Sequence, residues 1–223
     1  FPTASISAPI GQVQLSLSYR RDIKRPAYSS LTSSTIYLNR YAYQSGNPKL
    51  LPTYTHSVVL NAAYKWMGIS INYSRIKNSE TMSSEPFPGA EDPLVCLIRS
   101  INTDEDFNQL SLNPYASPTI GCWHPTWYVY ALFQNYKSPS ADGTIVTLNN
   151  PYFQFGWDNT IELPKHWRIN AGLRFNPKGD VGNFSMQRAQ TNTNIGIQRD
   201  FNLHRLGSLN LDLRCNDIFN TNK

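Results

Sequence analysis

Cysteine and histidine are the residue types in this chain that could bind a metal or act as nucleophile and base, but their spacing supports neither role. The three cysteines have no metal-ligand spacing and cannot all pair with one another. The four histidines occur in no CxxC or HExxH context, and no GxSxG sequence supplies a hydrolase serine. We therefore expect no enzyme activity, no metal and no cofactor. The residues interpreted as isolated strand or loop side chains are Cys96, Cys122, Cys215, His56, His124, His166 and His204.

The acidic segment 80–93 is the other group of residues with chemical potential. It contains Glu80, Glu85, Glu91 and Asp92 together with three prolines. These carboxylates could bind a divalent cation, but they do not have the register of an EF-hand loop. The alternative is a solvated acidic loop, which could contact a ligand without doing chemistry.

The composition excludes several classes of protein. Only 16% of residues are charged, and the mean hydropathy is −0.44, because Asn, Ser, Thr and Gln supply most of the polarity. The net charge of +5 comes from scattered basic residues with a single tight cluster at 20–25, so we expect no nucleic-acid binding. No run approaches the roughly 18 apolar residues of a membrane-spanning helix. No signal peptide precedes the strand-like segment at Phe1, which we interpret as a fragment of an exported protein.

Alternation of apolar and polar residues is the dominant pattern, and it predicts an all-β fold. Trp167, Ile169, Ala171, Leu173 and Phe175, for example, alternate with polar residues and a glycine. Successive side chains of a strand point to opposite faces, so each such segment has one apolar and one polar face. The predicted strands are 3–10, 12–21, 53–66, 68–77, 106–117, 126–137, 150–163, 167–176, 189–199 and 208–217, with Leu94–Ile101 as an additional short strand inside a loop.

The predicted connections alternate in length along the chain. Tight turns are expected at 10–12, 67–68 and 164–166 and a shorter one at 118–125, whereas 22–52, 78–105, 138–149 and 177–188 are long. Outer-membrane barrels have short periplasmic turns and long outer loops. Four of the five tryptophans (Trp66, Trp123, Trp127 and Trp167) lie near the shorter turns, and Trp157 alone lies in mid-strand. This placement is typical of a belt at the membrane interface, with ordinary core tryptophan as the alternative.

These patterns predict an antiparallel up-and-down transmembrane β-barrel. Residues 1–223 are expected to form a single partial barrel domain of about ten strands, in contact with outer-membrane lipid. The alternative is a soluble β-sandwich, for which an alternation of short and long connections is not expected.

Three segments resemble a known family. Residues 18–28, SYRRDIKRPAY, resemble its "SYSRRIxRPxYxxL" element, and residues 43–55, YQSGNPKLLPTYT, resemble "xxxGNPxLxPEYT". Residues 216–221, NDIFNT, are similar to the "DxFNT" that closes a late strand. The family is the outer-membrane β-barrel family associated with TonB-dependent receptors, common in Bacteroidetes. Thr53 departs from the usual Glu, and loop 29–40 lacks the usual "LNPF".

The motif residues are expected to shape loops. Proline fixes φ and favours an extended residue before it, and Gly-Asn permits turns. The residues assigned to this structural role are Arg25, Pro26, Tyr28, Gly46, Asn47, Pro48, Leu50, Pro52, Asp217, Phe219 and Asn220.

The resemblance implies a transporter for energised uptake of a bulky nutrient such as a siderophore, vitamin or glycan. It also implies a barrel of roughly 22 strands filled by an N-terminal plug, with this chain as the later part of the barrel. The implied partners are the plug, the remaining barrel strands, the TonB complex and a surface lipoprotein. The alternative is a non-transporting outer-membrane barrel that acts in adhesion or assembly.

Alternation assigns a face to the polar residues of the last strands. They should face the lumen, where they contact the plug or line the substrate path, or form only a hydrogen-bonded polar wall. These candidates are Arg168, Asn170, Arg174, Asn210, Asp212 and Arg214.

Overall fold

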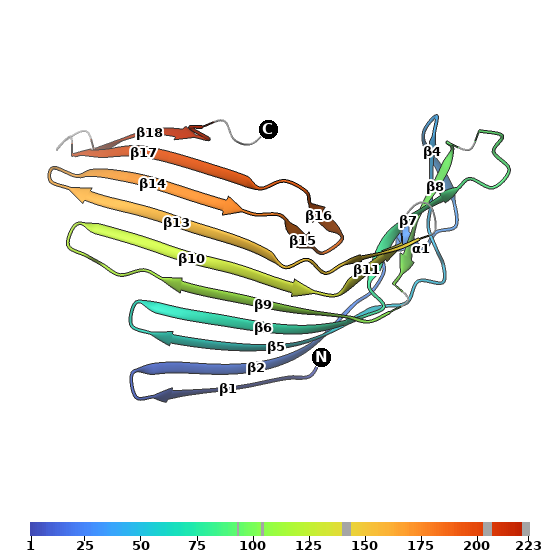
Figure 1. The fold of residues 1–223 in the computed structure, drawn as a ribbon, viewed down its shortest axis with the longest axis horizontal. Coiled ribbons are helices and arrows are strands. Elements are labelled where there is room, and N and C mark those ends of the chain that lie inside the picture. Colours follow the sequence, from blue (N-terminus) through green and yellow to red (C-terminus); the bar gives the residue numbers. More distant parts are fainter. Residues whose placement is uncertain (93, 104, 140–143, 203–206, 220–223) are drawn as a thin grey trace.

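The computed structural model of the chain describes residues 1–92, 94–103, 105–139, 144–202 and 207–219. Its main element is an antiparallel sheet of ten strands whose spatial order follows the chain (Figure 1). The strands are β1 (Thr3–Ile10), β2 (Val13–Lys24), β5 (Thr53–Tyr64), β6 (Met67–Lys77), β9 (Phe107–Ala116), β10 (Trp123–Gln134), β13 (Tyr152–Leu163), β14 (Trp167–Asn176), β17 (Gln190–Asn202) and β18 (Ser208–Asn216). The predicted all-β, up-and-down arrangement of about ten strands is confirmed.

The predicted and observed ends of the strands differ at several places, and β10 is the clearest case. This strand was predicted over 126–137 and runs from Trp123 to Gln134. Pro125 lies inside it, opposite Asn159, although a proline typically interrupts a ladder. At the other end, the side-chain oxygen of Asn135 accepts a hydrogen bond from the backbone N–H of Asn108 at 2.7 Å. The chain leaves the large sheet at that point.

The short connections lie at one end of the sheet and the long connections at the other, as predicted (Figure 1). The turn expected at 67–68 lies two residues earlier, at Lys65 and Trp66, where Lys65 adopts a left-handed φ of 47°. Met67 and Gly68 already belong to β6. We call the two ends of the sheet the turn end and the loop end.

Strand register separates apolar from polar residues over the middle of the sheet, whereas toward the loop end Arg21, His56 and Arg75 follow the apolar residues on the same face. Residues paired across neighbouring strands point to the same face. One such row reads Ile6, Leu17, Leu60, Ile71, Leu112 and Ala131, and the row two residues away along β2 on the same face reads Ala8, Leu15, Ala62, Ile69 and Pro114. The opposite face carries the row Ser7, Ser16, Asn61, Ser70 and Asn113.

The apolar face is largely open. Ile6 is 67% exposed and Leu213 is 64% exposed, at opposite sides of the sheet. A soluble protein rarely exposes a contiguous apolar surface of this extent, whereas the outer face of a membrane barrel is apolar throughout. Trp157 lies in the middle of β13, as predicted, and pairs directly with Trp127 of β10.

The long connections contain small sheets, of which the sequence predicted only one strand. The four-stranded sheet consists of β3 (Thr35–Asn39), β4 (Ala42–Ser45), β8 (Cys96–Asn102) and β7 (Glu80–Pro86), in that order. We call it the loop sheet. Two-stranded sheets are formed by β11 (Tyr136–Pro139) with β12 (Ile145–Leu148) and by β15 (Gly179–Val181) with β16 (Phe184–Met186). β8 confirms the additional strand expected at 94–101.

The loop sheet joins two connections that are far apart in sequence. β3 and β4 come from the β2–β5 connection, β7 and β8 from the β6–β9 connection, and β4 pairs with β8 in parallel. Its position beyond the loop end is visible in Figure 1. Half of the supposed acidic loop is therefore strand, and Glu85 forms an ion pair with Arg99 at 3.1 Å. The short helix α1 (Tyr28–Leu31) precedes β3. Among the described residues, no helix has the length and apolar character needed to cross a membrane.

The buried core is small and lies at the loop end. Phe107, Tyr136 and Leu148 are buried together, with Ile76 packed against them. The rings of Phe107 and Tyr136 meet edge-on with centroids 4.9 Å apart. Within the described part of the chain, β1 and β18 each pair with one neighbour, so the sheet is open.

Candidate functional site

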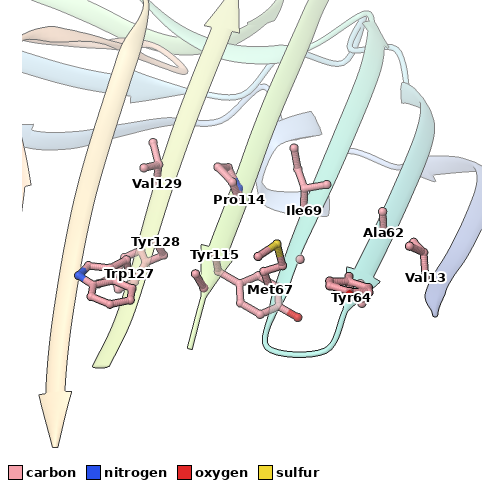
Figure 2. Close-up of a pocket in the computed structure, with 13 residues that line it drawn as sticks. Val13, Ala62, Tyr64, Met67, Ile69, Pro114, Tyr115, Trp127, Tyr128 and Val129 are labelled. Carbon is pink, nitrogen blue, oxygen red and sulfur yellow. The ribbon is translucent and has the colours of Figure 1, made fainter. Parts of the chain in front are cut away.

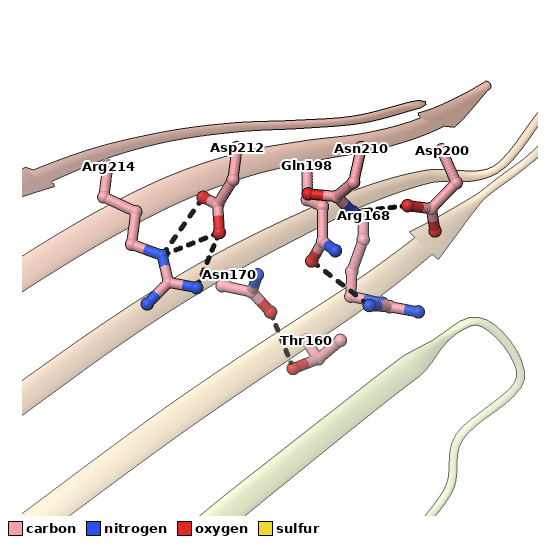
Figure 3. A network of polar contacts seen from close by, with 8 residues as sticks. All are labelled: Thr160, Arg168, Asn170, Gln198, Asp200, Asn210, Asp212 and Arg214. Carbon is pink, nitrogen blue, oxygen red and sulfur yellow. Dashed lines mark hydrogen bonds and ion pairs between the residues drawn. The ribbon is translucent and has the colours of Figure 1, made fainter. Parts of the chain in front are cut away.

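The six polar residues singled out in the last strands share the polar face of β14 and β18. All of them except Arg174 are drawn in Figure 3. Two rows of paired residues run across this region from β13 to β18. The row nearer the turn end is Glu162, Arg168, Gln198 and Asp212; the next row is Thr160, Asn170, Gly196 and Arg214. We call this region the polar band.

Hydrogen bonds link the band across three strands. Arg168 donates from Nη1 to Oε1 of Gln198 at 3.2 Å, and its Nε lies 3.8 Å from Oε1 of Glu162. The Thr160 hydroxyl donates to Oδ1 of Asn170 at 3.0 Å. These side chains point to the same side of the sheet (Figure 3). They form a continuous surface of donors and acceptors.

The outer strand β18 adds both signs of charge. Arg214 and Asp212 pair with Nη2 to Oδ2 at 2.6 Å, and Asn210 donates to the Asp200 carboxylate. Side-chain exposure is 70% for Arg214, which leaves it open to a ligand or to another part of the protein. Surface pairs of this kind contribute little to stability, so their interest is in recognition.

Arg174 lies farther toward the loop end and rests on an aromatic ring that the sequence analysis did not identify. Its Nε donates to the Tyr128 hydroxyl at 3.1 Å, although the two residues are on strands separated by β13. The ring crosses β13 above Gly156, where a Cβ atom would overlap it. A glycine inside an otherwise regular strand pattern marks such close approaches and was the available signal.

Gly172 of β14 also allows a close approach of neighbouring side chains. A Cβ at Gly172 would lie 2.6 Å from Oδ1 of Asn194 and 2.8 Å from Oδ1 of Asp158, so the two polar side chains converge over the glycine. The positions of the glycines therefore determine where polar side chains can converge on this face of the sheet.

The chemistry available to the band is binding. It offers arginines, carboxylates and amides without an arranged nucleophile and base. No group of three or more His, Cys, Asp or Glu residues that could hold a metal ion occurs in the part of the chain that the structure describes.

The motif residues between β4 and β5 connect the two long loops. The backbone N–H of Gly46 donates to the Thr32 carbonyl at 2.9 Å, and a Cβ there would overlap that carbonyl oxygen. Asn47 donates from Nδ2 to the Ser100 carbonyl at 3.2 Å, and Leu50 is buried.

The other motif residues have less defined surroundings. Arg25 and Pro26 lie between β2 and α1, Tyr28 begins α1 and is 91% exposed, and Pro48 and Pro52 lie between β4 and β5. Asp217 and exposed Phe219 follow β18, and Asn220 lies outside the described residues.

A hydroxyl-rich cavity of about 440 Å³ lies between the loop sheet and the segment around α1. Its polar lining includes Ser29, Ser30, Ser34, Gln44 and Arg99. Sequence reasoning missed this cavity because it assumed irregular loops, and only the pairing of β4 with β8 brings these residues together.

An apolar hollow of about 450 Å³ lies elsewhere, on the apolar face at the turn end (Figure 2). Tyr64, Met67 and Trp127 surround its turn-end side, and Ala62 and Pro114 leave space between the strands. Its lining offers almost no hydrogen-bonding groups, so it suits hydrocarbon and not a polar solute.

Comparisons with known proteins agree with this geometry. A family model described as "Outer membrane protein beta-barrel family" matches residues 1–223. Two similar solved structures are the ferric enterobactin receptor PfeA of Pseudomonas aeruginosa as a mutant with enterobactin (TM-score 0.68, 13% identity) and PfeA with BCV-L6 (TM-score 0.67, 12% identity). Each match covers 98% of this chain and 35% of the receptor. At this identity the likeness shows the fold alone. No curated protein matches the chain.

Proposed function

We propose, from the premise that the chain belongs to the outer membrane protein beta-barrel family, that it forms part of the wall of a TonB-dependent receptor that takes up a bulky nutrient. The family places the chain in the bacterial outer membrane. The observation that carries the proposal is the open ten-stranded meander, which superposes on about a third of a siderophore receptor.

The open sheet supports a larger barrel. In a membrane, unpaired backbone groups at a strand edge cost several kcal/mol each, so a spanning sheet must close on itself. Within the described residues β1 and β18 leave two such edges. The remaining strands and a plug would be supplied by parts of the parent protein outside this sequence.

The polar band supports a lumenal role. In a closed barrel the face opposite to lipid encloses the interior. Arg168, Arg174 and Arg214 would there contact the plug or a passing ligand, and the hydroxyl-rich cavity of the loop sheet would meet the ligand first. The substrate class proposed is a siderophore, vitamin or glycan.

The loop motifs support the Bacteroidetes type of receptor. Asn47 bonds to the Ser100 carbonyl of the other long connection, the Gly46 N–H bonds to Thr32 within its own connection, and Leu50 is buried, which supports the structural role we propose for these motif residues. A TonB complex and a surface lipoprotein are the proposed partners of the parent protein.

The alternative function is an outer-membrane barrel without transport, acting in adhesion or assembly. The loop sheet favours this alternative because it offers a hydrogen-bonded surface beyond the loop end of the membrane strands. A parent protein without a plug would identify this alternative directly.

Uptake by cells carrying the full-length parent tests the proposal. Accumulation of labelled ferric siderophores, cobalamin and oligosaccharides would be compared in cells with and without the parent gene, with TonB present or deleted. We expect one of these ligand classes to accumulate only with both genes. Accumulation that is independent of TonB, or no difference for any class, would contradict energised uptake.

A pair of variants tests the site itself. Arg174→Gln should lower accumulation because it removes the cation held over Gly156. Arg188→Gln, in an exposed connection away from the band, is the matched control and should retain accumulation.

A further inference from the structure

Arg199 lies on the apolar face of the sheet near the turn end, whereas Arg21 and Arg75, which share that face, lie near the loop end. Arg199 of β17 pairs with Trp167 on one side and Leu211 on the other, and both partners belong to the apolar face. Its guanidinium carbon lies 4.8 Å from the centroid of the Trp167 ring and 4.3 Å from that of Phe201. The cation is therefore held between two aromatic rings at the turn end of the lipid-facing surface.

The charge of Arg199 has no anionic partner among the described residues. The neighbouring carboxylates, Glu162 and Asp200, are on the opposite face, where they interact with Arg168 and Asn210. The Nε atom of Arg199 is shielded from solvent and has no hydrogen-bond partner. Burying an uncompensated guanidinium against lipid is costly, so this position calls for an external anion.

We propose that this end of the apolar face binds a phospholipid, with the Arg199 guanidinium bound to its phosphate. Guanidinium and phosphate match in geometry and form paired, charge-assisted hydrogen bonds. The two rings hold the planar group by cation–π contact, so little side-chain freedom is lost when the phosphate binds. The turn end faces the periplasm in outer-membrane barrels, which makes the occupant a lipid of the periplasmic leaflet.

A second observation gives the lipid a place for an acyl chain. An apolar hollow of about 330 Å³ lies toward the middle of the same face, between Trp123 and Trp157. Ala171 contributes to its lining, and its partner Ile195 lies four residues from Arg199 on β17. At about 3.3 Å per residue, four residues span roughly 13 Å, a distance that the glycerol and upper acyl chain of a phospholipid can cover.

The inference rests on the outer-membrane location and not on transport, so it can fail while the proposed function holds. The test uses the full-length parent purified from outer membranes in mild detergent and titrated with phosphatidylglycerol, with native mass spectrometry to measure the affinity. Arg199→Gln should weaken binding by about tenfold or more, which is the loss expected for a charge-assisted hydrogen bond. Arg188→Gln removes the same charge from an exposed connection at the loop end, so it is the matched control and should bind phosphatidylglycerol like the native protein.

Two further measurements define the ligand and protect against misfolding. Ala171→Leu projects a larger apolar side chain into the hollow without touching Arg199, and should weaken phosphatidylglycerol binding by a smaller factor. Inorganic phosphate at the same concentrations should not compete, because it lacks the acyl chains. Equal affinities in Arg199→Gln and the native protein, effective competition by inorganic phosphate, or preferential binding of lipid A would each overturn the proposal.

Discussion

The depth of Leu173 makes the assignment of the lipid face quantitatively testable. Leu173 lies on the apolar face of β14, paired with Trp157 and Thr193, and is 37% exposed. It is six residues from Trp167 at the turn end, which is about 20 Å along a strand. At the roughly 40° tilt of barrel strands this is about 15 Å of height, close to the middle of an apolar band about 25 Å tall.

Leu173→Arg in the full-length parent should therefore lower the free energy of unfolding by about 2–4 kcal/mol, the cost of an arginine near the bilayer midplane. Leu211→Arg should cost only about 0–1 kcal/mol, because Leu211 is in register with Arg199 at the interface. Alternation of apolar and polar residues does not distinguish the depths of the two leucines, because it gives only the face on which a residue lies.

Denaturant titration of the parent in lipid vesicles measures these values, with Asn210→Arg as the control on the polar face. An arginine there keeps a carboxylate, Asp200, within reach and should change stability by less than about 1 kcal/mol. The assignment of faces would be refuted if Asn210→Arg were as damaging as Leu173→Arg. Equal costs for the two leucine variants would refute the depth assignment.

The remaining predictions concern a close approach within the large sheet, one long connection and one turn-end connection. Gly156→Ala should destabilise the parent by about 1–3 kcal/mol in denaturant titration, because the new methyl group overlaps the Tyr128 ring. Gly196→Ala is the control and should change stability by less than about 0.5 kcal/mol, because its Cβ would have its nearest neighbours at 3.5 Å. Gly46→Ala should loosen the β2–β5 connection and speed its cleavage by protease on intact cells, since the new Cβ would overlap the backbone of Thr32 and Ser30. Unchanged cleavage would contradict this. In a variant with Cys96 and Cys215 replaced by Ser, Cys122, which is exposed in a turn-end connection, should react with a membrane-impermeant maleimide only after the outer membrane is permeabilised. Labelling of this variant in intact cells would reverse the orientation.

The sequence predicted the sheet well because its signals are local. Alternation in 167–175 and the glycine at 11 each act over a few residues, and β1 and β14 have the predicted bounds. The displacement of β10 arose where a proline is accommodated inside a paired strand, an effect of its neighbour β13. The depth of a residue in the membrane also cannot be predicted from local sequence. Trp157 lies beside Trp127 only because of the register between β10 and β13.

The candidate site was predictable in part for the same reason. Alternation was enough to place Arg168 and Asn170 on a polar face, but it could not find Tyr128 as the support of Arg174, because their contact crosses an intervening strand. The cavity at the loop sheet was out of reach, since it depends on pairing between two connections separated by a complete hairpin.

The parallel pairing of β4 with β8 constrains the order in which the protein folds. Between these strands the chain runs through β5 and β6, so residues 42–45 can meet residues 96–99 only after that hairpin has formed and brought the two connections to the same end. Closing so long a segment carries an entropic cost that adjacent hairpins do not have. We therefore expect the membrane strands to assemble first and the loop sheet to form last, when its β4–β8 pairing links two connections whose strands are already paired.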